Sequence, residues 1–387
     1  MLEKAQSIQT QIVQWRRQFH RHPELGFQEL QTAQCVAETC RQFGWRVRTG
    51  VGKTGVVAEL GNGEPCVGLR ADMDALPIQE VNEVEYASSV PDVMHACGHD
   101  AHTAILLGVA KLLSEEKFPG RVRLIFQPAE EVGDDEGISG APRMIADGAA
   151  QDLDAVFALH VDSSLDVGKI TIKDGFASAG VDTFYASIIG NGGHGAYPHR
   201  TIDPIYLSSL VVQAIHGIVS RRIHPFEPAV VSIGAIHGGK ASNVIPDQVE
   251  LIGTIRYLQP GVQKTIQLEV ENALQITRPL GGDYQLAWEI GYPPMFNHSD
   301  AVKMIQIVAG KMIGEQQVGI PDDDMGAEDF GFFTQETSGA MFYLGSKIEG
   351  DVRYGHQSRF DIDERCLPIG AALLAQIAIS ALQQKPQ

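Results

Sequence analysis

The sequence has few cysteines and no long apolar run. Its five cysteines, in 387 residues, have no spacing typical of a disulfide framework, which favours a reducing compartment over a disulfide-stabilised secreted fold. Residues 1–22 lack the apolar stretch of a secretory signal. No run reaches the roughly 18 apolar residues that a membrane span needs. We therefore expect a cytoplasmic protein without a membrane-spanning segment.

Positive charge is also scarce. The chain has 30 Lys and Arg residues against 48 Asp and Glu residues, which gives a formal net charge of -18. Nucleic acids and anionic membranes are bound by basic surfaces, so this balance argues against both kinds of partner. An anionic substrate would have to be met by local positive groups.

The composition itself is that of a globular chain long enough for two domains, with 44% apolar residues. Short apolar strands such as 122–126 and 155–159 alternate with helical patterns such as 101–113. This alternation predicts an α/β fold with a mostly parallel sheet and helices on both faces.

The pattern changes between residues 181 and 292, where strands and helices follow the order βαββαβ. That order is typical of a ferredoxin-like α+β domain. Alternating helices and strands return after residue 293. We therefore predict one discontinuous domain, 1–180 with 293–387, interrupted by an inserted domain, 181–292.

Residues 95–102 read His-Ala-Cys-Gly-His-Asp-Ala-His. Cys97 and His99 lie two apart, so on an extended backbone their side chains leave the same side. A thiolate and an imidazole together suit a transition metal such as zinc, but a thiol beside a histidine can also be a nucleophile with its base. The other polar side chains are expected to cap the following helix or to face solvent: His95, Asp100 and His102.

Further candidate ligands follow two of the predicted strands. Glu130 and Glu131 come after strand 122–126, and His160 directly follows strand 155–159. The carboxyl edge of an open α/β sheet is where ligands bind, so these side chains and the octet are expected to meet there, with His356 as a further candidate. Such a set can hold one or two metal ions, and one glutamate must stay free to act as a base. The residues alone do not say which glutamate that is.

Seven segments together resemble the metal-dependent amidohydrolases that cleave N-acyl amino acids. This group includes hippurate hydrolases, indoleacetyl-amino-acid hydrolases and aminoacylase-type enzymes, and is related to aminoacylase-1 and the glutamate carboxypeptidases. The likeness covers nearly the whole chain. The segments, in order, are 71–77 (ADMDALP), 95–102, 127–131 (QPAEE), 158–160 (ALH), 192–194 (GGH), 242–246 (SNVIP) and 326–330 (GAEDF).

The resemblance implies roles for the catalytic-domain residues. Glu130 matches the general base and acid, and Asp74 matches a carboxylate that orients a ligand. The related carboxypeptidases have histidine where Asp72 stands and aspartate where Cys97 stands, so the chain fits the amidohydrolase branch. One or two divalent ions, manganese or zinc, would be bound. The residues that match the metal ligands are Cys97, His99, Glu131, His160 and His356.

The inserted domain resembles the lid or dimerisation domain of this family. His194 matches a histidine that reaches an active site, often the partner subunit's, and stabilises the oxyanion. Asn243 and Arg256 match residues that bind the carboxylate of the amino-acid part. The role of His199 stays open between bonding substrate and bonding backbone. A homodimer through this domain is therefore expected.

The expected reaction is metal-dependent hydrolysis of the amide bond of small N-acyl-L-amino acids, giving a carboxylic acid and a free amino acid. Two alternatives stay open: an amidase that uses Cys97 as its nucleophile, and a non-catalytic binding protein on the same fold. Glu328 and Asp329 are expected to cap a helix, and Asp322 to Asp324 to form a solvated loop.

Overall fold

The computed structural model describes residues 1–384, which form two compact units. The first unit consists of Met1–Gly175, Phe296–Asp322 and residues 329–384, and the second of Phe176–Met295 and Asp323–Glu328. Each unit has its own hydrophobic core. The second unit thus interrupts the sequence of the first.

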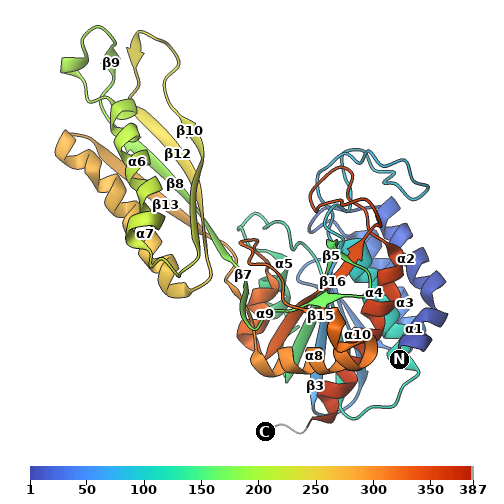
Figure 1. Cartoon of the computed structure of the whole chain (residues 1–387). Helices are drawn as coiled ribbons and strands as arrows, with labels where there is room; N and C mark the ends of the chain where they lie inside the picture. Colours follow the sequence, from blue (N-terminus) through green and yellow to red (C-terminus); the bar gives the residue numbers. More distant parts are fainter. Residues whose placement is uncertain (385–387) are drawn as a thin grey trace. The chain divides into compact units, whose positions relative to one another are not determined.

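The first unit is built on an eight-stranded sheet (Figure 1). Its four central strands, β4, β3, β5 and β16, run parallel to one another. All seven residues of β3 are buried, as expected for a strand that is covered on both faces. The predicted α/β architecture with a mostly parallel central sheet is confirmed. The strands in spatial order are β1 (Arg46–Val51), β2 (Gly55–Gly61), β4 (Arg121–Gln127), β3 (Cys66–Asp72), β5 (Ala155–Asp166), β16 (Gly339–Lys347), β6 (Ile170–Thr171) and β15 (Val318–Gly319).

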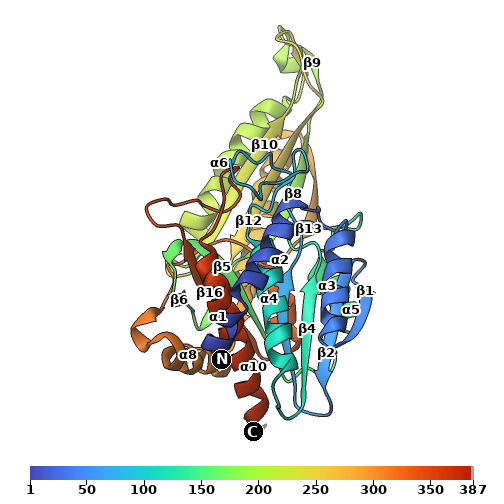
Figure 2. The ribbon, with the colours of Figure 1, turned by 90° about the vertical axis from the view of Figure 1, so that its right-hand side faces the viewer.

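Helices cover this sheet (Figures 1 and 2). Helices α4 and α10 pack on each other and on β3, whereas α5 and α9 pack together against β4 and β5. Fourteen side chains of α4 are buried, because the helix is apolar around nearly its whole circumference. The helices of this unit are α1 (Leu2–Ser7), α2 (Gln9–Arg21), α3 (Leu30–Gln42), α4 (His99–Ser114), α5 (Gly140–Ala146), α8 (Ser299–Ile313), α9 (Phe330–Glu336) and α10 (Leu367–Gln383), with short 3-10 turns at Glu315–Gln317 and Glu364–Cys366.

Helix α10 bears on the expectation that the chain has no membrane-spanning segment. The stretch Glu364–Gln383 is long and apolar enough to cross a membrane by length and composition, with a mean hydropathy of 1.7. However, 67% of it is buried within the protein, where it packs against α4 and α8. A core helix passes the same test, so this stretch is weak evidence for a membrane span.

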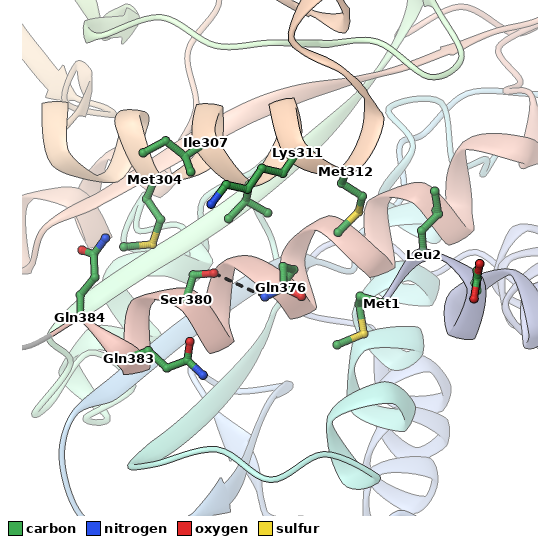
Figure 3. A pocket seen from close by; sticks show the side chains of 12 residues that line it. Met1, Leu2, Met304, Ile307, Lys311, Met312, Gln376, Ser380, Gln383 and Gln384 are labelled. Carbon is green, nitrogen blue, oxygen red and sulfur yellow. Dashed lines mark hydrogen bonds between the residues drawn. The ribbon is translucent and has the colours of Figure 1, made fainter.

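A cavity of about 720 Å³ opens beside α10, where α1 and α8 approach it (Figure 3). Methionine side chains from α8 and from the start of the chain contribute its apolar lining, and glutamine side chains of α10 contribute polar groups. Among the described residues that line this cavity, none is a predicted site residue. The functional site therefore has to be sought elsewhere in the unit.

The second unit contains a four-stranded antiparallel sheet in the order β10-β12-β8-β13. With α6 after β8 and α7 after β12, this is the strand order of a split βαβ sheet. Its core consists of the inward side chains of β8 and β12 and the apolar stripes of α6 and α7. The elements are β8 (Gly180–Ile189), β9 (Gly193–His194), α6 (Pro204–Arg222), β10 (Ala229–His237), β11 (Val244–Ile245), β12 (Gln248–Tyr257), α7 (Pro260–Leu274) and β13 (Asp283–Ile290), with 3-10 turns at Pro198–Arg200 and Gln275–Leu280.

The second unit extends a few residues beyond the inserted domain predicted over 181–292. The chain enters it through β7 (Gly175–Ser178) and leaves it through β14 (Met295–Asn297). The short segment Asp323–Glu328 also joins this unit, although it lies in a region assigned from the sequence to the first domain. A backbone hydrogen bond of 2.8 Å from Ala179 to Gly326 accounts for this attachment.

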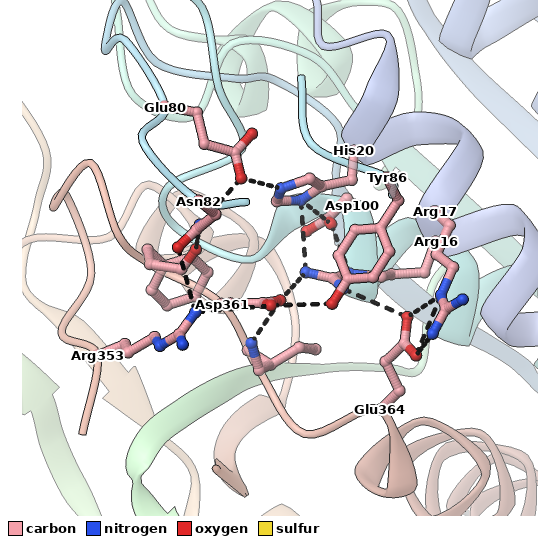
Figure 4. Close-up of polar contacts among 12 residues, drawn as sticks. Arg16, Arg17, His20, Glu80, Asn82, Tyr86, Asp100, Arg353, Asp361 and Glu364 are labelled. Carbon is pink, nitrogen blue, oxygen red and sulfur yellow. Dashed lines mark hydrogen bonds and ion pairs between the residues drawn. The ribbon is translucent and has the colours of Figure 1, made fainter. Parts of the chain in front are cut away.

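A buried cluster of charges ties distant parts of the first unit together (Figure 4). The Arg16 side chain on α2 is fully buried and donates to Asp100 on α4 at 2.8 Å and to Asp361 at 2.7 Å. His20 lies 2.8 Å from the same Asp100 oxygen. Glu364 completes the cluster at 3.3 Å from Arg16. Helices α2 and α4 and the segment before α10 therefore share one buried cation.

Replacing Arg16 should destabilise the first unit strongly. Arg16→Met leaves Asp100 and Asp361 buried without their main counter-charge, which costs about 3–5 kcal/mol. Arg17→Met is the matched control, because Arg17 is 43% exposed and its ion pair with Glu364 is worth at most about 1 kcal/mol. Urea unfolding of both variants measures the difference. Equal losses of stability would contradict the importance of the buried cluster.

Candidate functional site

The octet 95–102 forms the entry to α4. Gly98, the residue between Cys97 and His99, has a φ of +95°, and a Cβ there would lie 2.3 Å from Val161 Cγ2. Only glycine fits that position. His99 is already the first residue of the helix, two residues earlier than predicted. The side chains of Cys97 and His99 therefore lie on either side of one tight turn at Gly98.

Asp74 orients two of the other groups. Its Oδ1 lies 3.1 Å from His99 Nδ1, and its backbone carbonyl oxygen lies 2.9 Å from the same nitrogen. Its Oδ2 accepts a 3.0 Å hydrogen bond from the backbone N–H of Glu131. These contacts leave His99 Nε2 pointing away from Asp74, as a carboxylate that orients a metal ligand would require.

His160 and His356 approach from two further segments. Strand β5 does not end before His160, as the sequence predicted, but continues to Asp166, because β16 keeps pairing with it past that point. His160 therefore projects from within a strand, and its Nδ1 donates to the Val161 carbonyl at 2.8 Å. His356 has a φ of +61° and donates its backbone N–H to Ala96 at 2.7 Å. The Nε2 atoms of His160 and His356 both face other predicted ligands, Cys97 at 3.5 Å and Glu131 at 3.0 Å.

The five predicted ligands come together. Two triads of ligand atoms, Cys97 with His99 and His160, and Cys97 with Glu131 and His356, each lie within 4.8 Å of one another. The thiol is 3.5 Å from His160 Nε2, and Glu131 Oε1 is 3.0 Å from His356 Nε2 and 4.0 Å from His99 Nε2. Two ligands of one zinc ion at tetrahedral angles lie roughly 3.3–3.8 Å apart. The 3.5 Å separation lies within this range, and the 3.0 and 4.0 Å separations lie just below and just above it.

Two further observations support a metal site. His99 Nε2 is buried and has no hydrogen-bond partner among the described residues, and Glu131 Oε1 is buried with His356 Nε2 3.0 Å away. Burial disfavours ionisation of the Cys97 thiol, but His99 and His160 outweigh it and lower its pKa to about 6. Contacts with Cys97 and Glu131 raise the pKa of His356 to about 10. A buried cluster of thiol, imidazole and carboxylate groups of this kind suits a divalent cation.

The match to known proteins agrees with this donor set. Residues 68–380 match the family model described as Peptidase family M20/M25/M40. The chain belongs to this family. It is 37% identical to the hippurate hydrolase of Campylobacter jejuni, over 99% of this chain and all of that protein, and 40% identical to thermostable carboxypeptidase 2 of Saccharolobus solfataricus, over 97% and 96%.

The fold of this M20 family member also matches a solved structure. The YxeP protein of Bacillus subtilis, described as a dinuclear metal-binding peptidase of the M20 family, superposes with a TM-score of 0.85 at 31% identity and covers 98% of this chain and 100% of its own. Together these matches show that the chain is a metal-dependent amidohydrolase. They do not assign its individual site residues.

Three polar residues beside the ligands differ from the sequence-based expectations. Asp100 does not cap α4 but binds Arg16 and His20. His102 is 2% exposed rather than solvent-facing, and burial lowers its pKa to about 4. His95 is fully buried too. The partners of Asp100 and His102 come from remote parts of the chain, which local sequence patterns cannot reveal.

Asp329 directly precedes α9 but does not cap that helix with its side chain. It accepts hydrogen bonds from Gln127 at 2.8 Å and from Ser139 at 2.7 Å, and it pairs with Arg70 at 2.9 Å. The adjacent Asp72 pairs with the same arginine at 2.5 Å. This buried group was missed from the sequence, although Asp72 lies within the recognised 71–77 segment and Arg70 directly precedes it.

In the second unit, His194 and Asn243 lie on one ribbon. His194 on β9 is exposed and pairs with Val244 on β11, and the Asn243 carbonyl accepts from Gly195 at 2.8 Å. Arg256 lies near the other end of β12, eight residues beyond Gln248 in a strand that rises about 3.3 Å per residue. Within one chain the two side chains Asn243 and Arg256 therefore cannot hold the same carboxylate.

Changing the ligand thiol should weaken metal binding. Cys97→Ser replaces a thiolate by a neutral hydroxyl, a much poorer ligand for zinc, so metal content after dialysis should fall. Cys35→Ser, a partly exposed cysteine on α3, should leave it unchanged. Metal analysis of dialysed protein, with chelation and reconstitution, measures the difference. Full metal retention by Cys97→Ser would remove this thiol from the ligand set.

Proposed function

We propose that the chain hydrolyses the amide bond of N-acyl-L-amino acids to a carboxylic acid and a free amino acid. The observation that carries the proposal is the convergence of a thiol, three imidazoles and two adjacent carboxylates at the carboxyl edge of the sheet. The full-length similarity to a hippurate hydrolase supports this substrate class.

Glu130 is the proposed general base. Adjacent Glu131 lies beside His99 and His356, whereas Glu130 is 6% exposed and has a carboxylate oxygen within 4.8 Å of His99 and Glu131 ligand atoms. The preceding residue, Ala129, has a φ of +45°, so the two glutamates leave a strained turn in different directions. Glu130 would take the proton of the attacking water and pass it to the leaving nitrogen.

The proposed ligands are Cys97, His99, Glu131, His160 and His356. One or two divalent ions held there would activate water and polarise the scissile carbonyl. The thiolate and imidazoles favour zinc, and the carboxylates are also compatible with manganese. Cys97 belongs to both triads, so its thiolate would be a ligand that two ions could share.

Glu130→Gln should abolish hydrolysis without emptying the site. Losing a general base slows turnover by about 10²- to 10⁴-fold, whereas metal content should stay at the wild-type level. Glu136→Gln, on the exposed part of the same loop, is the matched control. Assays with N-acetyl, N-benzoyl and N-indoleacetyl amino acids measure turnover and define the acyl group.

The same assays separate the alternatives. An acyl-enzyme burst that persists after chelation would replace this mechanism by one in which Cys97 is the nucleophile. Tight binding of N-acyl amino acids without turnover by the metal-loaded wild type would favour a binding protein. Unchanged turnover by Glu130→Gln would refute the assignment of the base.

We further propose that the second unit acts as a lid and dimerisation domain. His194 would stabilise the oxyanion, and Asn243 and Arg256 would bind the substrate carboxylate. Because the ribbon with His194 and Asn243 and the position of Arg256 lie at opposite ends of β12, the two ends would serve different active sites of a homodimer. A cytoplasmic location is part of the same proposal.

Subunit mixing tests this arrangement. Glu130→Gln and His194→Ala should each be inactive alone, but a mixture that exchanges subunits should regain activity, since one site of each hybrid dimer contains both native residues. Light scattering establishes the oligomeric state, and mixing two Glu130→Gln preparations is the control. A monomer, or no recovery after demonstrated exchange, would contradict the shared sites.

A further inference from the structure

A single buried arginine joins two carboxylates behind the proposed site. Arg70 on β3 is 1% exposed, and its guanidinium donates to Asp72 at 2.5 Å and to Asp329 at 2.9 Å. Both carboxylates are fully buried. A planar guanidinium can serve two carboxylates at once in fixed directions, which an ammonium group cannot do.

The Asp72 branch leads to the backbone beside a proposed metal ligand. Asp72 Oδ1 lies 2.6 Å from His102 Nδ1, and the backbone N–H of Val161 donates to His102 Nε2 at 2.9 Å. Because Nε2 accepts, the ring proton is on Nδ1 and points at Asp72. Val161 directly follows His160, and its carbonyl in turn accepts from His160 Nδ1. This branch therefore fixes both the backbone and the ring of His160.

The Asp329 branch leads to the proposed base. The carboxylate of Asp329 also binds Gln127, at the end of the strand that precedes the two glutamates, and the backbone N–H of Ala141 at 3.0 Å. The backbone N–H of Asp329 donates to Glu130 Oε1 at 3.4 Å. Asp329 thus fixes the turn on which Glu130 is mounted and contacts its carboxylate directly.

We propose that Arg70 is a positioning residue that sets the base and one metal ligand together, through Asp329 to Glu130 and through Asp72 and His102 to His160. This inference rests on the proposed function, because it takes Glu130 as the base and His160 as a ligand. The two branches have separable consequences: the Asp329 branch controls turnover, and the Asp72 branch controls metal affinity.

Three variants test the two branches. Asp329→Asn should lower kcat by about 10- to 100-fold with metal affinity unchanged, the range found for residues that orient a metal site. His102→Asn keeps a donor toward Asp72 but removes the acceptor for Val161, so it should weaken zinc binding by about 10- to 100-fold while kcat at saturating zinc stays near wild type. Arg70→Lys should change both quantities, with KM little altered.

The matched control is Arg123→Lys. Arg123 is a second buried arginine, on the neighbouring strand β4, and donates to Glu59 at 2.8 Å and to the Ala149 and Gln151 carbonyls at 2.9 and 2.7 Å. It lies near the amino end of β4, away from Glu130. Its replacement should lower thermal stability without changing kcat or zinc affinity.

Zinc titration of the chelated protein, steady-state kinetics and thermal unfolding are measured on all variants, with Glu130→Gln in the same series. If Arg70→Lys changes kcat no more than Arg123→Lys, or if Asp329→Asn and His102→Asn affect kcat and zinc affinity alike, the inference is overturned. If Glu130→Gln remains active, the proposed function fails instead. Should Arg70→Lys not fold, the two branch variants decide.

Discussion

The first unit depends on one constraint: the charges buried inside it have to be paired with opposite charges. Arg16 and Arg70 are both buried, and each pairs with two carboxylates, at least one of them from a remote segment. An uncompensated charge in such a place costs several kcal/mol, so neither cluster can lose its cation without a structural response. Hydrogen bonds connect the Arg70 cluster to the proposed site residues, through His102 to the backbone beside His160 and through Asp329 to Glu130.

Backbone conformations that L-residues rarely adopt occur at three positions in or beside the proposed site. Gly98, Ala129 and His356 all have positive φ, and they precede, adjoin or supply proposed site residues. For the two non-glycine residues such a conformation costs of order 1–3 kcal/mol each. The surrounding hydrogen bonds, such as the 2.8 Å contact from Ala129 N–H to Glu29, hold the chain in place. These conformations lower the stability of the fold, and in return they fix the directions of the neighbouring site side chains.

The sequence was sufficient to predict features that depend on local pattern. Short apolar runs alternating with helical patterns located strands of the parallel sheet, and the motifs found Cys97, His99, Glu131, His160 and His356, which the structure brings together. It failed where the partner is remote: the spacing around Asp100 suggests a cap, yet Arg16, 84 positions away, binds it. His102 and Asp329 were misjudged for the same reason. A hydrogen-bond or ion-pair partner from a remote segment cannot be recognised from the residues that adjoin a side chain in the sequence.

The interruption of one unit by the other sets an order of events during synthesis. The second unit is nearly contiguous, over Phe176–Met295, so its core can form while the ribosome is still making the rest. The first unit has to wait, because the central strand β16 and the apolar helix α10 are translated last. Until then the partner surfaces of α4 stay uncovered. Nascent chains therefore carry a folded insert between two unfinished halves, and this is the stage at which they are most exposed to aggregation and most in need of chaperones.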